Sequence, residues 1–310
     1  MIRSAAKNHE FITIITEPSD YNTLLEEMKI NSGKTSLDFR RSMAVKAFEK
    51  TTEYDNNIYQ WLSNFNKEKI EKENFPKNLK LDLNRSSLLR YGENPHQKAA
   101  LYSSNSKKNG IFSSEQLHGK PLSYNNINDT DAAVEIINEL EFFKKSTIVI
   151  IKHANPCGVA INDNLKTAYL NALKCDPVSA FGGIIAANKT IDIDTAKEIA
   201  KIFTEVIIAP DFDKDGLELL SKNKNLRILA NKNLNQLDYS ENLIKSIAGG
   251  YLVQSRDAES VSENDLDIVT KVKPTEIQTQ DMLFAFKVAK HVKSNAIVYA
   301  KDLATVGIGA

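Results

Sequence analysis

The four consecutive apolar residues 148–151, Ile-Val-Ile-Ile, constrain the fold more than any other feature of this sequence. Successive side chains of a β-strand point to opposite faces of a sheet, so a strand that is apolar at every position is buried on both faces. Such strands belong to sheets that helices cover on both sides. This segment therefore predicts an α/β fold.

Helical and extended patterns alternate along most of the chain, with few residues between them. The predicted strands are 99–102, 147–152, 183–187, 206–209, 226–229, 297–299 and 304–308, and the predicted helices are 129–143, 165–173, 194–203, one that ends near residue 220, and 275–293. We find no internal repeat in the sequence. The alternation supports the α/β assignment.

The first 66 residues have a separate pattern. We predict a strand over 11–16, a short helix that ends near residue 30, and a helical hairpin over 37–65. The run that follows, 66–74, is charged and has no apolar periodicity. Segments of this composition connect domains, so we place a domain boundary at about 67–82.

Charge and cysteine content exclude several classes of protein. Lys+Arg and Asp+Glu are equal at 40 each in the 310 residues, so the chain as a whole has no field that would attract nucleic acid or an anionic membrane. Its two cysteines form no CxxC motif, which is typical of a reducing compartment. No run approaches the roughly 18 apolar residues of a spanning helix. We expect a cytoplasmic protein that binds neither nucleic acid nor membrane.

The segment 152–158, Lys-His-Ala-Asn-Pro-Cys-Gly, has the composition of a ligand site. It follows directly on the most apolar strand, and ligands of α/β proteins bind where loops leave the carboxyl ends of strands. An imidazole beside an ammonium group is disfavoured from taking up a second positive charge, so it can accept a proton. The alternative is a strand end that is exposed to solvent, with a histidine whose ring nitrogens already have hydrogen-bond partners.

Three other polar segments have both a functional and a structural interpretation. Residues 89–97, Leu-Arg-Tyr-Gly-Glu-Asn-Pro-His-Gln, combine groups that surround ligands, or form a turn whose side chains satisfy its own backbone. The Gly pair that ends 176–183 would let backbone approach a ligand, or marks a turn. Asn295 follows a predicted helix, where it would ordinarily be a C-cap.

Two familiar motifs are incomplete. Residues 32–36 contain the Gly-Lys-Thr of a phosphate-binding loop, but Met28 stands where the loop requires Gly. Residues 153–157 resemble the zinc site of the deaminases, but Asn155 replaces the general acid and no second cysteine follows Cys157 at the required spacing. We therefore expect no metal.

Taken together, six motifs resemble the bifunctional purine-biosynthesis family of AICAR transformylase and IMP cyclohydrolase. They occur in the family's order and span essentially the whole chain: Arg-Ser-Ala-Ala-Lys-Asn-His (3–9), 89–97, Leu-Ser-Tyr-Asn-Asn (122–126), 152–158, Ser-Ala-Phe-Gly (179–182) and Ser-Asn-Ala-Ile-Val-Tyr-Ala-Lys (294–301). The resemblance implies that 1–82 is the C-terminal part of a methylglyoxal-synthase-like cyclohydrolase domain plus a linker. Residues 83–310 would be a transformylase domain similar to cytidine deaminase.

In this family the exocyclic amine of AICAR attacks the formyl group of the co-substrate 10-formyltetrahydrofolate, and the product closes to IMP with loss of water. The resemblance implies that His153 is the base and that Lys152 stabilises the transition state. Asn295 would hold the amine and the formyl group in register. Lys7 matches the proton-transfer residue of the cyclohydrolase.

Five further residues would bind AICAR. The resemblance assigns the phosphate and nearby polar groups to Arg90 and Tyr91, and the lining of the nucleotide to Asn126, Gly182 and Glu205. The role of Glu205 follows less directly from the resemblance, because some relatives carry Asp at this position. The resemblance also implies a homodimer whose two protomers share this site.

Both domains of the family extend beyond the ends of this chain, so the resemblance implies a fragment truncated at both ends, which we expect to be inactive alone. Two other functions stay open at this point. One is a non-catalytic, transformylase-like protein that binds a nucleotide, and the other is a zinc deaminase.

Overall fold

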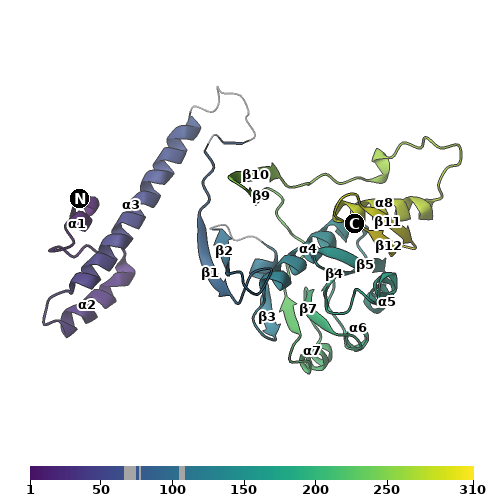
Figure 1. Ribbon diagram of the computed structural model, residues 1–310, viewed down its shortest axis with the longest axis horizontal. Helices are drawn as coiled ribbons and strands as arrows, with labels where there is room; N and C mark the ends of the chain where they lie inside the picture. The colour runs from purple at the N-terminus through teal and green to yellow at the C-terminus, as the bar shows by residue number, and fades with distance from the viewer. Residues whose placement is uncertain (66–74, 77, 105–108) are drawn as a thin grey trace. The chain divides into compact units, whose positions relative to one another are not determined.

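The computed structural model describes residues 1–65, 75–76, 78–104 and 109–310 (Figure 1). The chain divides into two compact units, Met1–Lys80 and Leu81–Ala310. The charged run 66–74 and much of the predicted boundary lie outside the described residues.

The described residues of the unit Met1–Lys80 form helices and no strand. The helices are α1 (Ile2–Lys7), a 3-10 turn (Pro18–Asp20), α2 (Tyr21–Ile30) and α3 (Leu37–Phe65). The predicted short helix is confirmed by α2. The helical hairpin predicted over 37–65 is wrong, because this segment is one continuous helix. It contains neither Gly nor Pro, so its backbone has no residue that would break the helical hydrogen bonds.

The strand predicted over 11–16 is also wrong, since these residues have no regular structure. A strand is stable only where a neighbour completes its hydrogen bonds, and the described residues of this unit offer no such neighbour. The preceding backbone is held by Arg40 instead, which donates from Nε to the carbonyl of His9 and from Nη2 to that of Glu10, each over 2.8 Å. Ala6 of α1 is fully buried in a small cluster with alanines of α3.

The unit Leu81–Ala310 is built on an eight-stranded mixed sheet with the order β11-β12-β5-β4-β6-β7-β8-β3. Its strands are β3 (Glu115–His118), β4 (Ser146–Lys152), β5 (Asn155–Asn162), β6 (Gly183–Ala187), β7 (Thr204–Ala209), β8 (Arg227–Ala230), β11 (Ile297–Lys301) and β12 (Ala304–Gly309). Strands β6, β7 and β8 are parallel, and the other neighbours are antiparallel. Two separate ribbons pair β1 (Leu83–Leu89) with β2 (Ala99–Ser104) and β9 (Asn242–Ile247) with β10 (Gly250–Ser255).

Helices cover both faces of this sheet. They are α4 (Tyr124–Leu140), α5 (Leu165–Cys175), α6 (Ile193–Ile199), α7 (Lys214–Ser221) and α8 (Glu276–Lys290), with 3-10 turns at Ile111–Ser113, Glu141–Phe143 and Glu263–Asp265. Val149 and Ile151 of β4 pack in one cluster with α4 and α8, whereas Ile148 and Ile150 pack in a second cluster with α5, α6 and α7. The predicted α/β fold, with a strand buried on both faces, is therefore confirmed.

Most elements predicted for this unit are present with shifted ends. Helix α4 begins at Tyr124 rather than at 129, because Ser123 and Asn126 form a capping box. The strands β1, β3, β5, β9 and β10 were not predicted in full or at all. They are short, exposed or interrupted by Gly and Pro, and their sequences carry little strand signal.

Residues 155–158 form the first half of β5, although their sequence does not resemble a strand. Pro156 is accommodated at an irregularity in the register between β4 and β5, so the ladder tolerates a residue without an N–H. Gly158 is required by packing, because a Cβ at this position would lie 1.9 Å from the carbonyl oxygen of Ala172 in α5. Both residues look like strand breakers in the sequence, and both serve a buried strand.

The structure contains one helix–hairpin unit twice, although the sequence shows no repeat. Helix α4 leads into the β4–β5 hairpin, and α8 leads into the β11–β12 hairpin. Each helix begins with a capping box, at Ser123 and at Thr275. Each carries an aspartate at the same distance from its N-cap, Asp129 and Asp281, that accepts hydrogen bonds from the turn of the hairpin.

A buried ion network joins α4 to α8. Glu139 of α4 accepts hydrogen bonds from Lys287 (3.0 Å) and Lys290 (2.9 Å) of α8, and Lys287 is only 1% exposed. Burial by itself would raise the pKa of Glu139, but its cationic partners lower that pKa from 4.5 to about 2. His291 Nε2 lies 3.9 Å from Glu139 Oε2, which is beyond hydrogen-bond distance. We therefore attribute the lowered pKa of Glu139 to the ammonium groups of Lys287 and Lys290.

Replacing Glu139 with Gln should lower the free energy of unfolding of this unit by about 3–5 kcal/mol at neutral pH, because it leaves the Lys287 charge buried without a counter-charge. A lowered pKa stabilises the fold above the ordinary carboxyl pKa, and this contribution disappears as the pH falls toward about 2. The difference between the variant and the unchanged protein should therefore shrink from pH 5 toward pH 2. Amide hydrogen exchange of β4 in both proteins, at each pH, measures this difference in the free energy of unfolding.

The matched control is Asp163→Asn, which removes an exposed ion pair with Lys145 and should cost less than about 1 kcal/mol. Equal losses for the two variants would show that the buried network does not stabilise the packing of α4 on α8.

Candidate functional site

The candidate residues of the larger unit gather at one edge of the sheet. Strand β4 is antiparallel to β6, so its carboxyl end lies beside the amino ends of β6 and of the parallel strands β7 and β8. The amino-terminal turns of α4 reach the same edge through hydrogen bonds from Asn126 to Glu205 of β7 and from the β4–β5 turn to Asp129. The predicted position, at the carboxyl end of a buried strand, corresponds to the end of β4. Its sheet neighbours β5 and β6, and β7 beyond β6, contribute their amino ends.

Lys152 and His153 lie at the turn of the β4–β5 hairpin. The turn consists of His153 and Ala154, both with φ of +56°, and Lys152 pairs with Asn155 across it. Two successive left-handed residues are typical of a type I′ turn, in which Asn and Gly are preferred. His153 is exposed at this turn, so its imidazole can reach a ligand.

The ammonium group of Lys152 connects the hairpin to the segment that precedes β6. Its Nζ donates to the carbonyl of Phe181 over 2.8 Å. The next residue, Gly182, has φ of +74° and donates its N–H to the carbonyl of Phe203 over 2.8 Å. Hydrogen bonding from Ser179 lowers the pKa of Asp176 in the same segment, and the nearby charge of Lys152 adds to that effect.

Asn126 and Glu205 are bonded to each other. Asn126 is 3% exposed, and its Nδ2 donates to Glu205 Oε2 over 2.7 Å. Its Oδ1 accepts from the backbone N–H of Ser123 over 3.1 Å. The amide therefore anchors the start of α4 on β7, and a ligand at this edge would meet the Asn126–Glu205 pair rather than a separate amide.

The segment 89–97 forms a closed loop. The N–H of Gly92 donates to the carbonyl of Gln97 over 2.8 Å, and Gln97 Oε1 accepts from the N–H of Asn94 over 2.8 Å. The amide side chain of Gln97 thus satisfies part of the loop's own backbone, as the structural interpretation predicts. Arg90 and Tyr91 do not take part in these bonds, and the guanidinium of Arg90 lies 5.6 Å from the centre of the Tyr91 ring.

Two contacts bring this loop and the loop of Asn295 toward the other candidates. Asn125 of α4 donates to the carbonyl of Glu93 over 3.2 Å. The N–H of Lys293 donates to Asn155 Oδ1 over 3.4 Å, which places the chain leading to Asn295 beside the β4–β5 turn. Asn295 is exposed and is not a C-cap, because α8 ends at Lys290.

Lys7 belongs to the other unit, where it is the exposed last residue of α1.

Asp129 is not predicted as part of this site from the sequence, and Asn155 is predicted only as a member of the segment 152–158, without its contact to Lys293. Each acts through a contact with a segment that is remote in the sequence, and an aspartate on a helix reads as part of a solvated face. The signal that could have found Asp129 is its recurrence in α8, where Asp281 holds the same position relative to the N-cap.

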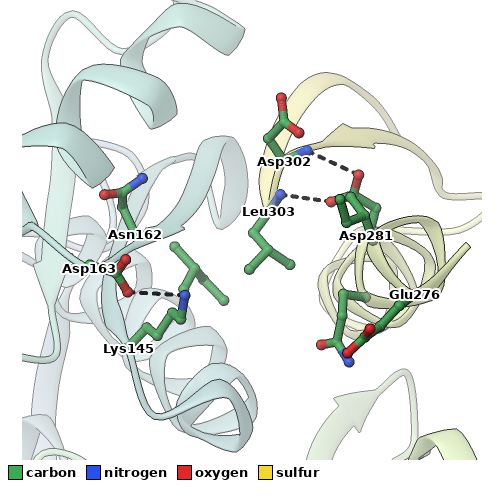
Figure 2. A pocket seen from close by; sticks show the side chains of 10 residues that line it. Lys145, Asn162, Asp163, Glu276, Asp281, Asp302 and Leu303 are labelled. Atoms are coloured by element: carbon green, nitrogen blue, oxygen red, sulfur yellow. Dashed lines mark hydrogen bonds and ion pairs between the residues drawn. The ribbon is translucent and has the colours of Figure 1, made fainter.

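A cavity at the opposite end of β4 is not lined by these residues. It has a volume of about 460 Å³ and lies where β4 begins and β5 ends, against the start of α8 and the β11–β12 turn (Figure 2). Its lining includes Asp163, Glu276, Asp281 and Asp302, with Lys145 as its cation. A predominantly acidic lining does not suit a phosphate.

Among the residues that the structure describes, no group of three or more His, Cys, Asp or Glu side chains could hold a metal ion. None of the described helices combines the length and the apolar character needed to cross a membrane. Cys157 and Cys175 are both free thiols.

Comparison with known proteins gives a consistent family. The family model described as AICARFT/IMPCHase bienzyme matches residues 5–310. The bifunctional purine biosynthesis proteins PurH of Mesorhizobium japonicum and of Bradyrhizobium diazoefficiens are each 50% identical to the chain, over 310 and 311 residues. The PurH of Thermoanaerobacter sp. is 51% identical over 309 residues. These matches cover 100% of the chain but only 57–58% of the relatives, so the chain spans somewhat more than half of their length.

The contact between Asn126 and Glu205 can be tested with an isosteric change. Asn126→Asp keeps the acceptor for the Ser123 N–H but replaces the donor to Glu205 with a second carboxylate. We expect a loss of about 2 kcal/mol or more in the free energy of opening of the first turn of α4 at neutral pH. As the pH is lowered, protonation of one of the two adjacent carboxyls restores a donor, and the loss should shrink.

Hydrogen exchange of the first α4 amides measures this effect. The control is Asn125→Asp, which introduces the same charge and gives up only an exposed hydrogen bond to the carbonyl of Glu93. Both positions lie in the first helical turn, where the helix dipole favours a negative charge. A loss of the same size at Asn125 would mean that the contact with Glu205 is not the cause.

Proposed function

The chain belongs to the AICARFT/IMPCHase bienzyme family, and from this membership we propose that it takes part in the formation of IMP in purine biosynthesis. The proposed reaction transfers a formyl group from 10-formyltetrahydrofolate to the 5-amino group of AICAR. Ring closure of formyl-AICAR to IMP then follows in the cyclohydrolase half. We assign 83–310 to the transformylase domain and 1–82 to part of the cyclohydrolase domain and its linker. The division of the structure after Lys80 supports this assignment.

We propose a cytidine-deaminase-like fold for the transformylase domain and a methylglyoxal-synthase-like fold for the cyclohydrolase domain. The mixed sheet with helices on both faces supports the first assignment. We also propose that the protein is cytoplasmic.

The Lys152–His153 turn is the observation that carries the proposed formyl transfer. An aromatic amine beside a carboxamide is a poor nucleophile, so the step needs a base at the amine and a cation at the developing negative charge. The exposed imidazole of His153 accepts the amine proton as the nitrogen attacks the formyl carbon. The bond from that carbon to the folate nitrogen then breaks, and the folate nitrogen takes up a proton. The adjacent ammonium of Lys152, already directed by the Phe181 carbonyl, stabilises the oxyanion.

The remaining proposed roles concern binding. Arg90 and Tyr91 are outside the bonds that close their loop, so a guanidinium and a phenol can contact the AICAR phosphate. Gly182 follows Phe181, whose carbonyl binds Lys152. Because Gly182 has no side chain, the nucleotide can approach the backbone there. The Asn126–Glu205 pair contacts the nucleotide as a unit, and Asn295 holds the amine and the formyl group in register.

We further propose Lys7 as a proton-transfer residue of the cyclohydrolase, and a homodimer in which Arg90 serves the Lys152 and His153 of the partner protomer. The non-catalytic alternative is not favoured, because the relatives reported above are named as bifunctional biosynthetic proteins. A zinc deaminase is not favoured for the same reason.

The test of the proposed function is His153→Ala in the complete product of the coding region that contains these 310 residues. The rate of formyl transfer, measured as the release of tetrahydrofolate, should fall by at least 100-fold. Ring closure of supplied formyl-AICAR should stay within a few-fold, because it uses the other domain. Transfer at the normal rate would exclude His153 as the base.

A second variant, Arg90→Ala, tests the phosphate assignment. The apparent KM for AICAR should rise at least 10-fold while the KM for 10-formyltetrahydrofolate changes little, because the phosphate belongs to AICAR. Equal increases for both substrates would indicate that Arg90 supports the fold instead. Lys98→Ala, a change of the next cation along the same segment, is the matched control.

A further inference from the structure

The turn that bears His153 is held by a single carboxylate from outside the hairpin. Asp129 of α4 accepts the N–H of His153 at Oδ2 and the N–H of Ala154 at Oδ1, each over 2.9 Å. These N–H groups belong to the two residues with left-handed backbone. One side chain therefore satisfies both donors of the turn and joins it to a helix that packs on the sheet.

This support matters because the turn has no residue that adopts its conformation easily. In type I′ turns both central residues have positive φ, and Gly or Asn usually fills them. His153 and Ala154 carry side chains that disfavour this backbone. A turn of the same length with negative φ would point the Cβ of His153 in another direction, so the external hydrogen bonds decide where the imidazole lies.

The second hairpin repeats the same arrangement independently. The β11–β12 turn consists of Asp302 and Leu303, with φ of +53° and +55°. Asp281 of α8 accepts their two N–H groups over 3.0 and 2.7 Å (Figure 2). Among the described residues, these two turns are the only places where consecutive non-glycine residues have positive φ. In both of these turns a helix aspartate accepts the two N–H groups.

We propose that Asp129 is a positioning residue for formyl transfer, which fixes the backbone of His153 and thereby the direction of its imidazole. The inference rests on the proposed function, in which His153 is the base. Asp129 touches neither substrate in this account. It follows Asn126 by one helical turn on α4, and Asn126 is bonded to Glu205 at the proposed nucleotide site. The same helix thus sets the base and the nucleotide-binding pair in register.

The test is Asp129→Asn in the complete product of the coding region. The side chain keeps its shape and loses one acceptor and its charge. We expect kcat for formyl transfer to fall roughly 100-fold, the cost of a misplaced catalytic group, while the KM for AICAR stays within a few-fold. Hydrogen exchange of the segment 152–155 should become faster, while that of the rest of β4 should not.

A second substitution separates positioning from a general loss of structure. Glycine adopts positive φ without strain, so adding Ala154→Gly to Asp129→Asn should restore at least 10-fold of the lost kcat. The matched control, Asp281→Asn, makes the same chemical change at the second hairpin. It should speed exchange at 302–303 and leave exchange at 152–155 unchanged, with kcat within a few-fold.

The outcomes are distinguishable. If His153→Ala abolishes transfer but Asp129→Asn leaves kcat unchanged, the positioning role is excluded and the proposed function stands. A rise in KM alone, a fall in kcat without faster exchange at 152–155, or no gain from Ala154→Gly would also exclude it. If His153→Ala leaves transfer unchanged, both the proposed function and this inference fail.

Discussion

The burial of β4 on both faces is the constraint on which the rest of the larger unit depends. Its four central residues are apolar and almost inaccessible, with two packed toward α4 and α8 and two toward α5, α6 and α7. A strand in this position cannot be shifted by one residue without exchanging the two clusters, so its register is fixed. Because the strand is fixed, its carboxyl end is a rigid place for polar groups.

The polar groups at that end are held by a small number of directed contacts. Asp129 holds the turn, Lys152 is anchored on the Phe181 carbonyl, and Asn126 joins α4 to β7 through Glu205. Each contact links the hairpin or the helix to a different part of the sheet. Proposed catalysis by His153 thus depends on hydrogen bonds that lie outside the reacting groups, as expected where a reactive side chain sits on a turn.

The sequence predicts the features that rest on local pattern and fails on those that rest on distant partners. The alternation of apolar segments predicts β4 and β6 well, and the motif at 152–158 predicts where polar residues follow β4. Strand β5 escapes prediction because Pro156 and Gly158 look like breakers until the register irregularity and the approach of α5 are seen. The segment 11–16 has a strand-like composition without a strand to pair with among the described residues of its unit.

The site is predicted only in part, for the same reason. Lys152 and His153 stand out in the sequence because their chemistry is local. Asp129 does not, because its role depends on a turn 24 residues away. The recurrence of this arrangement at Asp281 is visible only in three dimensions, since the two helices share little sequence beyond their caps and their aspartates.

Hydrogen exchange of the complete protein with and without AICAR measures which edge of the sheet binds the nucleotide. We expect AICAR to slow exchange at residues 90–92, 152–155 and 182–183, on the side of the sheet where β4 ends. Exchange should not change at 276–281 and 302–303, the segments beside the acidic cavity at the beginning of β4. Protection of the acidic cavity without protection of the β4–β5 turn would show that the nucleotide binds at the opposite edge.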